Sequence, residues 1–152
     1  MIDDLDRIMA VMATAFDPAF GEAWTRRQVE DALLMGNCHV VLIDAKGRVP
    51  DEEPAVGFAL LRATLDEEEL LLFAVDPGHR RQGLGAQLLD AIINQAKQRG
   101  MLRIFLEMRR GNSAERLYVG RGFSVIGQRA NYYRTAMNER IDAVSFALSM
   151  ND

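Results

Sequence analysis

The spacing of apolar residues predicts three main helices. Apolar side chains recur at helical intervals from Leu5 to Phe16. A polar loop separates that helix from a second, from Thr25 to Gly36, whose start is a capping-box signal because Gln28 follows Thr25 by three residues. The longest helix is expected from Gly83 to Arg99, where leucines, isoleucines and alanines form one stripe and Gly100 follows as a cap. A short fourth helix is expected from Ser113 to Val119.

Runs rich in β-branched and aromatic residues predict six strands between these helices. The expected strands are His39–Ile43, Ala55–Leu65, Glu68–Val75, Leu102–Glu107, Phe123–Tyr133 and Val144–Met150. The third is continuously apolar from Leu70 to Val75, as expected for a strand covered on both faces. The order of elements predicts an α/β sandwich around one mixed sheet flanked by helices, in a single domain spanning residues 1–152.

Composition agrees with an ordinary globular domain. The chain has 152 residues, of which 49% are hydrophobic and 26% charged, so it can bury a core without disulfides. The net charge of −4 argues against non-specific nucleic-acid binding and is compatible with a basic substrate. No apolar run reaches the ~20 residues of a membrane span, and the acidic N-terminus lacks the basic start of a signal peptide. We therefore expect a cytoplasmic protein that engages neither nucleic acid nor membrane directly.

Metal and thiol chemistry are not expected. The single cysteine, Cys38, lies among apolar residues and is interpreted as a buried structural thiol. The two histidines, His39 and His79, are not spaced as a metal site.

The segment from Val75 to Gly85 carries the strongest chemical signal. A buried strand ends, a loop rich in Arg and Gly follows, and a helix begins, so backbone N–H groups and a helix dipole face one place. This arrangement suits a phosphate or pyrophosphate, to which Arg80 and Arg81 could add charge. The Walker loop does not fit, because Gly85 is followed by Ala86 rather than Lys, and the dinucleotide fingerprint lacks its third glycine. An ordinary glycine-containing loop with solvated arginines is the alternative.

The run Arg80-Arg81-Gln82-Gly83-Leu84-Gly85 resembles the coenzyme A loop of the GNAT acetyltransferase superfamily. The resemblance implies that acetyl-CoA is the co-substrate and that backbone N–H groups hold its pyrophosphate. The residues implicated are Arg81, Gln82, Gly83, Leu84, Gly85 and Ala86. It also implies that the pantetheine arm pairs with the strand edge at Phe73, Ala74 and Val75, and that the thioester lies beside the splayed end of that strand. A backbone N–H near Val75 could polarise the thioester carbonyl.

Two later segments resemble the ribosomal-protein-alanine N-acetyltransferase (RimI) group. They are Leu106 to Phe123, which contains Leu-Glu-Met-Arg, an Asn, Leu-Tyr and Gly-Phe, and Arg129 to Tyr133, which reads Arg-Ala-Asn-Tyr-Tyr. The chain departs from that group in three places that concern the acceptor pocket. The spacing from Glu107 to Tyr118 is one residue shorter, the N-terminus is too short for the usual first strand, and Trp24 is the candidate replacement for a missing aromatic.

The resemblance assigns the reacting groups. Glu107 is the implied general base, directly or through one water, with an ion pair to Arg109 or a solvated strand end as the alternative. Tyr118 is the implied acid that protonates the departing thiolate, with core packing as the alternative. Asn112 either bonds the pantetheine arm or caps the following helix.

The acceptor side is expected to be polar and aromatic. The candidate groove residues are Trp24, Arg129, Asn131, Tyr132 and Tyr133, with Trp24 and Tyr132 as the readers of the first acceptor residues. The acidic run from Asp66 to Glu69 could attract a cationic substrate, although a solvated turn explains it more simply. The favoured acceptor is the α-amine of a protein N-terminus, and the resemblance implies that of a small-subunit ribosomal protein. The alternatives are a polyamine or aminoglycoside acceptor and a non-catalytic acyl-CoA sensor.

Overall fold

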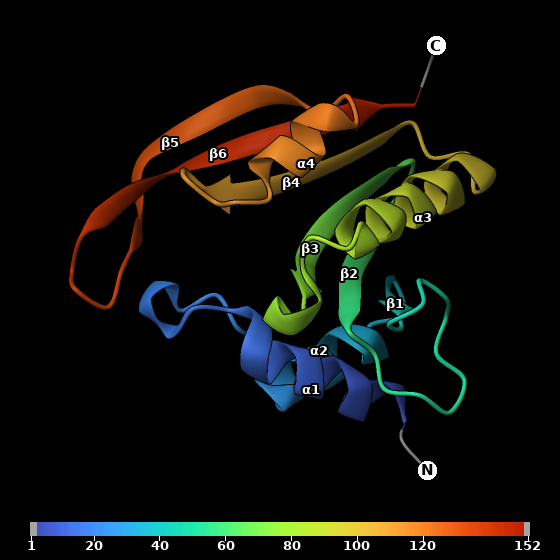
Figure 1. Ribbon diagram of the computed structural model, residues 1–152. Helices are drawn as coiled ribbons and strands as arrows, with labels where there is room; N and C mark the ends of the chain where they lie inside the picture. Colours follow the sequence, from blue (N-terminus) through green and yellow to red (C-terminus); the bar gives the residue numbers. More distant parts are fainter. Residues whose placement is uncertain (1–2, 151–152) are drawn as a thin grey trace.

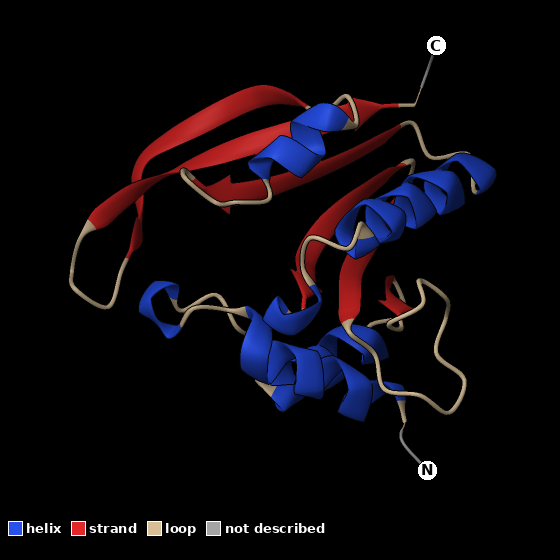
Figure 2. Ribbon diagram, viewed as in Figure 1, coloured by secondary structure: helices blue, strands red, loops and turns tan. Residues whose placement is uncertain are grey.

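A six-stranded mixed sheet organises the computed structural model, which describes residues 3–150 (Figures 1 and 2). The strands lie in the order β1-β2-β3-β4-β6-β5. Their bounds are β1 Cys38–Ile43, β2 Gly57–Thr64, β3 Glu67–Val75, β4 Arg103–Arg109, β5 Ser124–Arg134 and β6 Arg140–Ser149. All neighbours are antiparallel except β3 and β4, which run parallel. The α/β fold with a mixed central sheet is thus confirmed.

Residues 3–150 contain four α-helices, of which the first three begin after a side-chain cap or a glycine. They are α1 Asp4–Ala15, α2 Arg26–Leu34, α3 Leu84–Gln98 and α4 Glu115–Gly120. Asp3 caps α1 by accepting from the Asp6 N–H, and the predicted capping box of Thr25 and Gln28 is present at α2. Gly83 precedes α3 in a left-handed conformation (φ 77°) and offers no side-chain cap. The first turn of α3 therefore keeps its N–H groups available.

The helices cover the sheet from both sides and divide the core in two. Figure 1 shows α1 and α2 on one face of β1–β3, with α3 on the other. Ile8, Val11 and Val29 pack with Phe58 and Leu60 in the cluster under α1 and α2. The other cluster joins the apolar stripe of α3 to β4, β6 and the ring of Tyr118 from α4. The predicted stripe of α3 is buried along its whole length, whereas the stripes of the first two helices are buried in part.

The parallel pair β3–β4 is paired at one end only. Glu67, Glu68 and Glu69 pair with Arg103, Ile104 and Phe105, and beyond that point the strands separate. A register shift between β2 and β3 leaves Leu71 without a partner residue, as in a β-bulge. The prediction that β3 is covered on both faces is wrong at this end, where Leu71 and Phe73 are only partly buried and face cavities.

Several element bounds differ from the sequence-based expectation. Within residues 3–150 the first element is α1, which begins at Asp4. Helix α4 begins at Glu115 rather than Ser113, because Asn112 to Ala114 form a turn before it. Strand β6 begins at Arg140, earlier than expected, because a long hairpin joins it to β5. The second helix ends at Leu34, before the glycine taken as its limit.

In the acidic run from Asp66 to Glu69, only Asp66 lies in an exposed turn. The three glutamates of the run lie in β3 and pair with Arg103, Arg99 and Arg62 respectively. Glu68 is 0% exposed, contacts Arg99 and lies 3.6 Å from His39 Nε2. The run sits at the closed end of the β3–β4 pair, and none of its residues lines a cavity described below, so its proposed role in attracting substrate is not supported.

Cys38 is less buried than predicted. The thiol lies at the start of β1, partly exposed, and packs against the core cluster under α1 and α2. Burial is the main cause that raises its pKa, which keeps the thiol protonated and unreactive at neutral pH.

Candidate functional site

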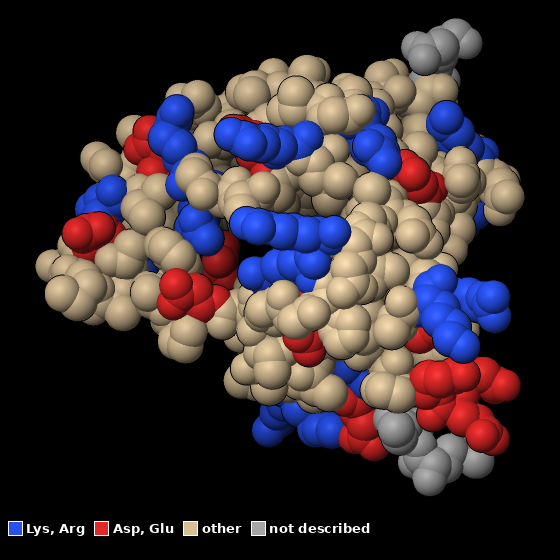
Figure 3. Space-filling model, in the orientation of Figure 1, with Lys and Arg blue, Asp and Glu red and all other residues tan. Residues whose placement is uncertain are grey.

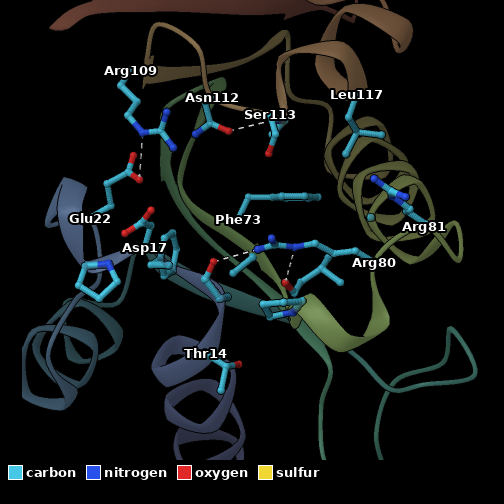
Figure 4. Close-up of a pocket in the computed structure, with 18 residues that line it drawn as sticks. Thr14, Asp17, Glu22, Phe73, Arg80, Arg81, Arg109, Asn112, Ser113 and Leu117 are labelled. Atoms are coloured by element: carbon cyan, nitrogen blue, oxygen red, sulfur yellow. Dashed lines mark hydrogen bonds and ion pairs between the residues drawn. The ribbon is translucent and has the colours of Figure 1, made fainter.

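The separated ends of β3 and β4 open onto two adjoining cavities. The first cavity has a volume of about 650 Å³ and lies between the end of α1, the end of β3, the start of α3 and the turn before α4 (Figure 4). The second cavity, of about 320 Å³, lies between the separated strands, beside the loop that joins α1 to α2. They share wall residues that include Phe16, Glu22, Phe73 and Asn112. Figure 3 shows charged side chains of both signs around a hollow on this face.

The loop before α3 forms the floor of the first cavity. Arg81 adopts a left-handed conformation (φ 65°), and Gly83 follows in the same region. None of the backbone N–H groups from Arg81 to Ala86 donates to a partner within residues 3–150. Unpaired N–H groups at a helix start bind anions, so the loop is suited to a pyrophosphate. Both Arg81 and Gly85 line the cavity.

The side chain of Arg80 bonds to two backbone carbonyls, a role that the sequence did not indicate. Its Nε donates to the Val75 carbonyl at 3.2 Å and a terminal nitrogen donates to the Ala15 carbonyl at 2.9 Å (Figure 4). The side chain thereby ties the end of α1 to the end of β3. It still adds positive charge to the wall of the first cavity.

The free edge of β3 runs along the two cavities. Because pairing with β4 ends at Glu69, the edge of β3 from Leu70 to Val75 that faces β4 has no strand partner there. Phe73, Ala74 and Val75 all line the first cavity. An extended ligand arm can pair with such an edge as an additional strand would.

Glu107 lies in the wall of the second cavity. Its side chain is 24% exposed, its Oε2 lies 3.4 Å from Arg129 Nε, and Ser145 Oγ donates to the same oxygen at 3.3 Å. The alternative ion pair with Arg109 is wrong, because Arg109 pairs with Glu22 instead. Glu107 is therefore a partly solvated carboxylate held by two side chains that the strand order brings beside it.

Tyr118, which belongs to α4, also lines the second cavity. The residue is buried, and its ring makes edge-to-face contacts with Phe73 at 5.8 Å and Phe123 at 5.5 Å between centroids. Burial raises the pKa of the phenol well above its usual range, because the anion would lose its hydration. The hydroxyl is thus kept protonated, as a proton donor must be.

Asn112 caps the turn before α4 and also lines both cavities. Its Oδ1 accepts from the Ala114 N–H at 2.9 Å (Figure 4). Asn112 thus stabilises the turn but does not cap α4 itself, whose N-cap, Ala114, has no side-chain cap. The amide nitrogen of Asn112, for which no partner is found within residues 3–150, remains able to donate to a ligand.

The predicted groove residues divide between the cavity and the surface. Trp24 and Tyr133 line the second cavity, and burial raises the pKa of Tyr133 to about 12, with Glu107 and Glu22 contributing. Tyr132 is half exposed and is not in the wall of either cavity; its ring lies under the Arg129 guanidinium at 4.9 Å. The pairing of Trp24 with Tyr132 as groove walls is not supported, because Trp24 and Tyr133 line the second cavity and Tyr132 lines neither.

Asn131 shapes the backbone instead of contributing a groove side chain. It has a left-handed conformation (φ 55°) inside the irregular stretch between Arg129 and Tyr133, where β5 has extra residues opposite Asp142. Its N–H donates to Asp142 Oδ1 at 2.9 Å. Asparagine tolerates this conformation better than most residues, which accounts for its presence.

Two wall residues were missed by sequence reasoning. Glu22 lines both cavities and pairs with Arg109 at 3.4 Å, and Phe20 lies beneath the Arg109 guanidinium at 3.6 Å from the ring centroid. Both come from the loop after α1, which reads as a polar connection. The only signal was an acidic and an aromatic residue around Gly21.

Among residues 3–150, no three or more His, Cys, Asp or Glu side chains gather as a metal site. Over the same range, every helix is too short or too polar to cross a membrane.

Comparisons with known proteins agree with this geometry. Residues 6–123 match the family model described as Acetyltransferase (GNAT) family. A [ribosomal protein bS18]-alanine N-acetyltransferase from Haemophilus ducreyi is 39% identical over 99 residues, which cover 64% of this chain and 68% of the relative. The same enzyme from Escherichia coli is 41% identical over 95 residues, covering 62% and 64%.

The whole fold also has a counterpart among solved structures. The crystal structure of the ribosomal-protein-S18-alanine N-acetyltransferase from Escherichia coli superposes with a TM-score of 0.81 at 29% identity, covering 99% of this chain and 92% of that one. The family match spans more than half of the chain, and it includes the loop before α3, Glu107 and Tyr118. The chain belongs to the GNAT family of acetyltransferases.

Proposed function

We propose that this protein transfers the acetyl group of acetyl-CoA to the N-terminal α-amine of a protein, by direct attack in a ternary complex. The observation that carries the proposal is the meeting of two cavities at the separated ends of β3 and β4. The first has an anion-binding floor, and the second contains a carboxylate, Glu107, and a protonated phenol, Tyr118.

The first cavity is the proposed site of the donor. The N–H groups from Arg81 to Ala86 would hold the pyrophosphate, and the edge of β3 at Phe73 to Val75 would pair with the pantetheine arm. The amide nitrogen of Asn112 is placed to donate to the same arm. This arrangement would direct the thioester toward the shared wall of the two cavities. When bound, acetyl-CoA supplies an acyl group already activated as a thioester.

Glu107 is the proposed base. An α-amine has a reference pKa of about 7.7–8.0, so near neutral pH most of it is protonated and must lose a proton before attack. Glu107 lies in the second cavity with its carboxylate partly exposed, and would accept this proton directly or through one water. A lysine amine, with a reference pKa of about 10.4, would be far more rarely free.

Tyr118 is the proposed acid. The amine nitrogen attacks the thioester carbonyl carbon, the carbon–sulfur bond breaks, and the thiolate takes the phenol proton. The new amide nitrogen loses its extra proton to solvent, and the phenolate takes up a proton from solvent in turn. Burial keeps the phenol protonated before the reaction, because the pKa of Tyr118 is raised. A backbone N–H at the end of β3, near Val75, would polarise the carbonyl during attack.

The proposed acceptor follows from the relatives and from the wall of the second cavity. Relatives that share 39% and 41% identity are named for acetylating the alanine of ribosomal protein bS18. In this chain, Trp24 and Tyr133 offer flat apolar walls for a small first residue, while Glu107 offers negative charge for an ammonium group. We infer an acceptor of the same class, a ribosomal protein with a small N-terminal residue, which would place the reaction in the cytoplasm.

A competition experiment tests the proposal. Wild-type protein is incubated with acetyl-CoA and three acceptors at equal concentration: an Ala-starting basic peptide, the same peptide blocked at its N-terminus but containing lysine, and an aminoglycoside. Mass spectrometry then locates the acetyl group. The proposal predicts acetylation of the free N-terminus above the other two. Preferential modification of lysine or the aminoglycoside would overturn the acceptor, and binding of coenzyme A without any turnover would indicate a sensor.

A further inference from the structure

Arg109 and Glu22 form an ion pair at the boundary of the two cavities. Arg109 Nε lies 3.4 Å from Glu22 Oε1, and the side chains are 17% and 23% exposed. Figure 4 shows the two side chains pointing toward each other from opposite walls of the first cavity. A pair with this little solvent is held more firmly than an exposed one, because water screens it less.

A second contact strengthens this pair. The Arg109 guanidinium lies 3.6 Å from the centroid of the Phe20 ring, within the range of a cation–π interaction. One guanidinium at the end of β4 therefore holds two residues of the loop that joins α1 to α2. No other described side chain within residues 3–150 pairs with Glu22.

The loop that Arg109 holds belongs to both cavities. Phe20, Gly21, Glu22 and Trp24 line the second cavity, and Asp17, Pro18 and Glu22 line the first. The ends of the loop, Phe16 and Trp24, pack against the core cluster under α1 and α2. Between them, Arg109 and the tip of the β5–β6 hairpin hold the loop, the latter through the Ala136 N–H that donates to the Ala19 carbonyl at 2.7 Å. The loop has only one short 3₁₀ turn, η1 Pro18–Phe20, and so depends on these outside contacts for its position.

We propose that Arg109 is a positioning residue for acetyl transfer. It acts through Glu22 and Phe20 to set the wall of the acceptor site, and does not itself touch the reacting atoms. Glu107 and Arg109 project from the same side of β4, because they are two residues apart. The pairing with Glu22 diverts the Arg109 charge from Glu107, which pairs with Arg129 instead. The kinetic test of this inference rests on the proposed function. The contacts of Arg109 with Glu22 and Phe20, and their effect on the loop, do not depend on that function.

The kinetic test is a charge swap. Glu22→Gln, Arg109→Met and the double variant Glu22→Arg/Arg109→Glu are assayed with an Ala-starting peptide and acetyl-CoA. Each single variant should raise the KM for the peptide about five- to thirtyfold, the size expected for one partly exposed ion pair with a stacking contact. The kcat and the KM for acetyl-CoA should remain within about twofold, and the double swap should recover most of the peptide KM.

Asp90→Asn is the matched control. It breaks the Arg121–Asp90 pair, whose 2.8 Å contact lies outside both cavities, and should leave the peptide KM unchanged. A general loss of stability would instead change all kinetic constants together, and the melting temperature of each variant records it. If the swapped pair does not fold, Arg109→Met combined with Glu22→Gln replaces it. Coupling then requires that the two changes together cost no more than the larger single change.

Hydrogen exchange separates this inference from the proposed function. Arg109→Met should raise amide exchange across residues 17–24 above wild type without any substrate present, while α3 keeps its protection. That result supports the positioning role even if the wild type does not acetylate the peptide, in which case the proposed function alone fails. Unchanged exchange in residues 17–24, or a peptide KM that stays at the wild-type value, overturns the inference.

Discussion

The two ends of the β3–β4 pair use the same residue types for opposite purposes. At the closed end, Glu67 and Glu68 pair with Arg103 and Arg99, Glu68 is wholly buried, and no cavity opens there. At the open end, Glu107 and Glu22 also pair with arginines, but their carboxylates lie in cavity walls and keep about a quarter of their surface exposed. The ion pairs at the closed end stabilise the contact between β3 and β4. The ion pairs at the open end hold the carboxylates in place and leave them partly exposed to solvent.

An ion pair between a carboxylate and an arginine therefore does not by itself identify a functional site. A paired carboxylate that is also reachable can exchange its partner for a substrate, whereas one sealed in the core can only stabilise the fold. Changes at the open end should therefore reduce turnover and leave stability nearly intact. Changes at the closed end should do the reverse.

The largest effect is expected at Tyr118. Tyr118→Phe removes one hydroxyl and keeps the ring contacts with Phe73 and Phe123. Turnover should fall about 10²–10⁴-fold, since the thiolate loses its proton donor, while coenzyme A affinity and melting temperature stay close to wild type. Single-turnover kinetics with calorimetry measures both. A near-normal rate of the chemical step would return Tyr118 to a packing role.

Glu107→Gln should be next in size. The rate should fall about 10²-fold near pH 7, where most of an α-amine is protonated. The deficit should shrink as pH rises through the pKa of the amine, because free amine then needs no base. A pH–rate profile of the variant beside wild type decides the matter. A loss that is the same from neutral to alkaline pH would indicate that Glu107 positions the acceptor instead of taking its proton.

Glu68→Gln tests the closed end. The substitution removes a buried charge that pairs with Arg99, and the free energy of unfolding should fall by about 1–3 kcal/mol. Turnover at 25 °C should change by less than about twofold, because Glu68 lines neither cavity. Urea denaturation and steady-state assays on one preparation provide both numbers. Normal stability combined with lost activity would reverse the assignment of the two ends.

Gly85→Val tests whether the loop before α3, at the open end, binds coenzyme A. A Cβ at Gly85 meets Leu117 at 3.5 Å and Val75 at 3.8 Å, which are ordinary contacts, so the fold should tolerate it. A branched side chain would occupy the first cavity and weaken coenzyme A binding about tenfold or more. Gly120→Ala, where a Cβ has open space, is the control. Equal affinities of both variants for coenzyme A, by calorimetry, would remove the donor from this loop.

The smallest effect is a pH dependence at the closed end. Burial is the main cause that lowers the pKa of His39, with Arg99 adding to it and Glu68 opposing it. The unfolded chain, with a histidine pKa of about 6.5, then takes up the proton more readily than the folded chain. The free energy of unfolding that neutral His39 contributes is therefore fully present above about pH 6.5, the pKa of the histidine in the unfolded chain. It declines as the pH falls below this value, because the unfolded chain then binds the proton more readily than the folded chain. His39→Gln should flatten the stability curve between pH 7 and 5, and an unchanged slope in urea titrations would contradict this.

Much of the donor side could be predicted from the sequence, because it is built from consecutive residues. The end of β3, the loop from Arg81 to Ala86 and the stripe of α3 follow one another in the chain, and local patterns suffice to describe them. The same holds for Glu107 and Tyr118, whose motif lies within Leu106 to Phe123. The role of Arg80 was missed, since its partner, the Ala15 carbonyl, is 65 residues away in sequence.

The acceptor side could be predicted only in part, because several distant segments meet there. The position of β6 between β4 and β5 brings Ser145 and Arg129 to Glu107, and no local pattern indicates that strand order. The extra residues between Arg129 and Tyr133 break the alternation of β5, so no local pattern indicates that Tyr133 rather than Tyr132 lines the second cavity. The burial of Glu68 was missed because a run of acidic residues ordinarily marks a solvated surface.

The most direct test is a crystal structure with a bisubstrate analogue that joins the coenzyme A sulfur, through an acetyl linker, to the α-amine of an Ala-starting peptide. The account predicts the pyrophosphate on the N–H groups of Arg81 to Ala86 and the pantetheine along Phe73 to Val75. It places the linked sulfur within hydrogen-bond distance of the Tyr118 hydroxyl and the amine nitrogen beside Glu107, directly or through one water. A sulfur remote from Tyr118, or a peptide that leaves by a path not bounded by Glu22, Trp24 and Tyr133, would contradict it.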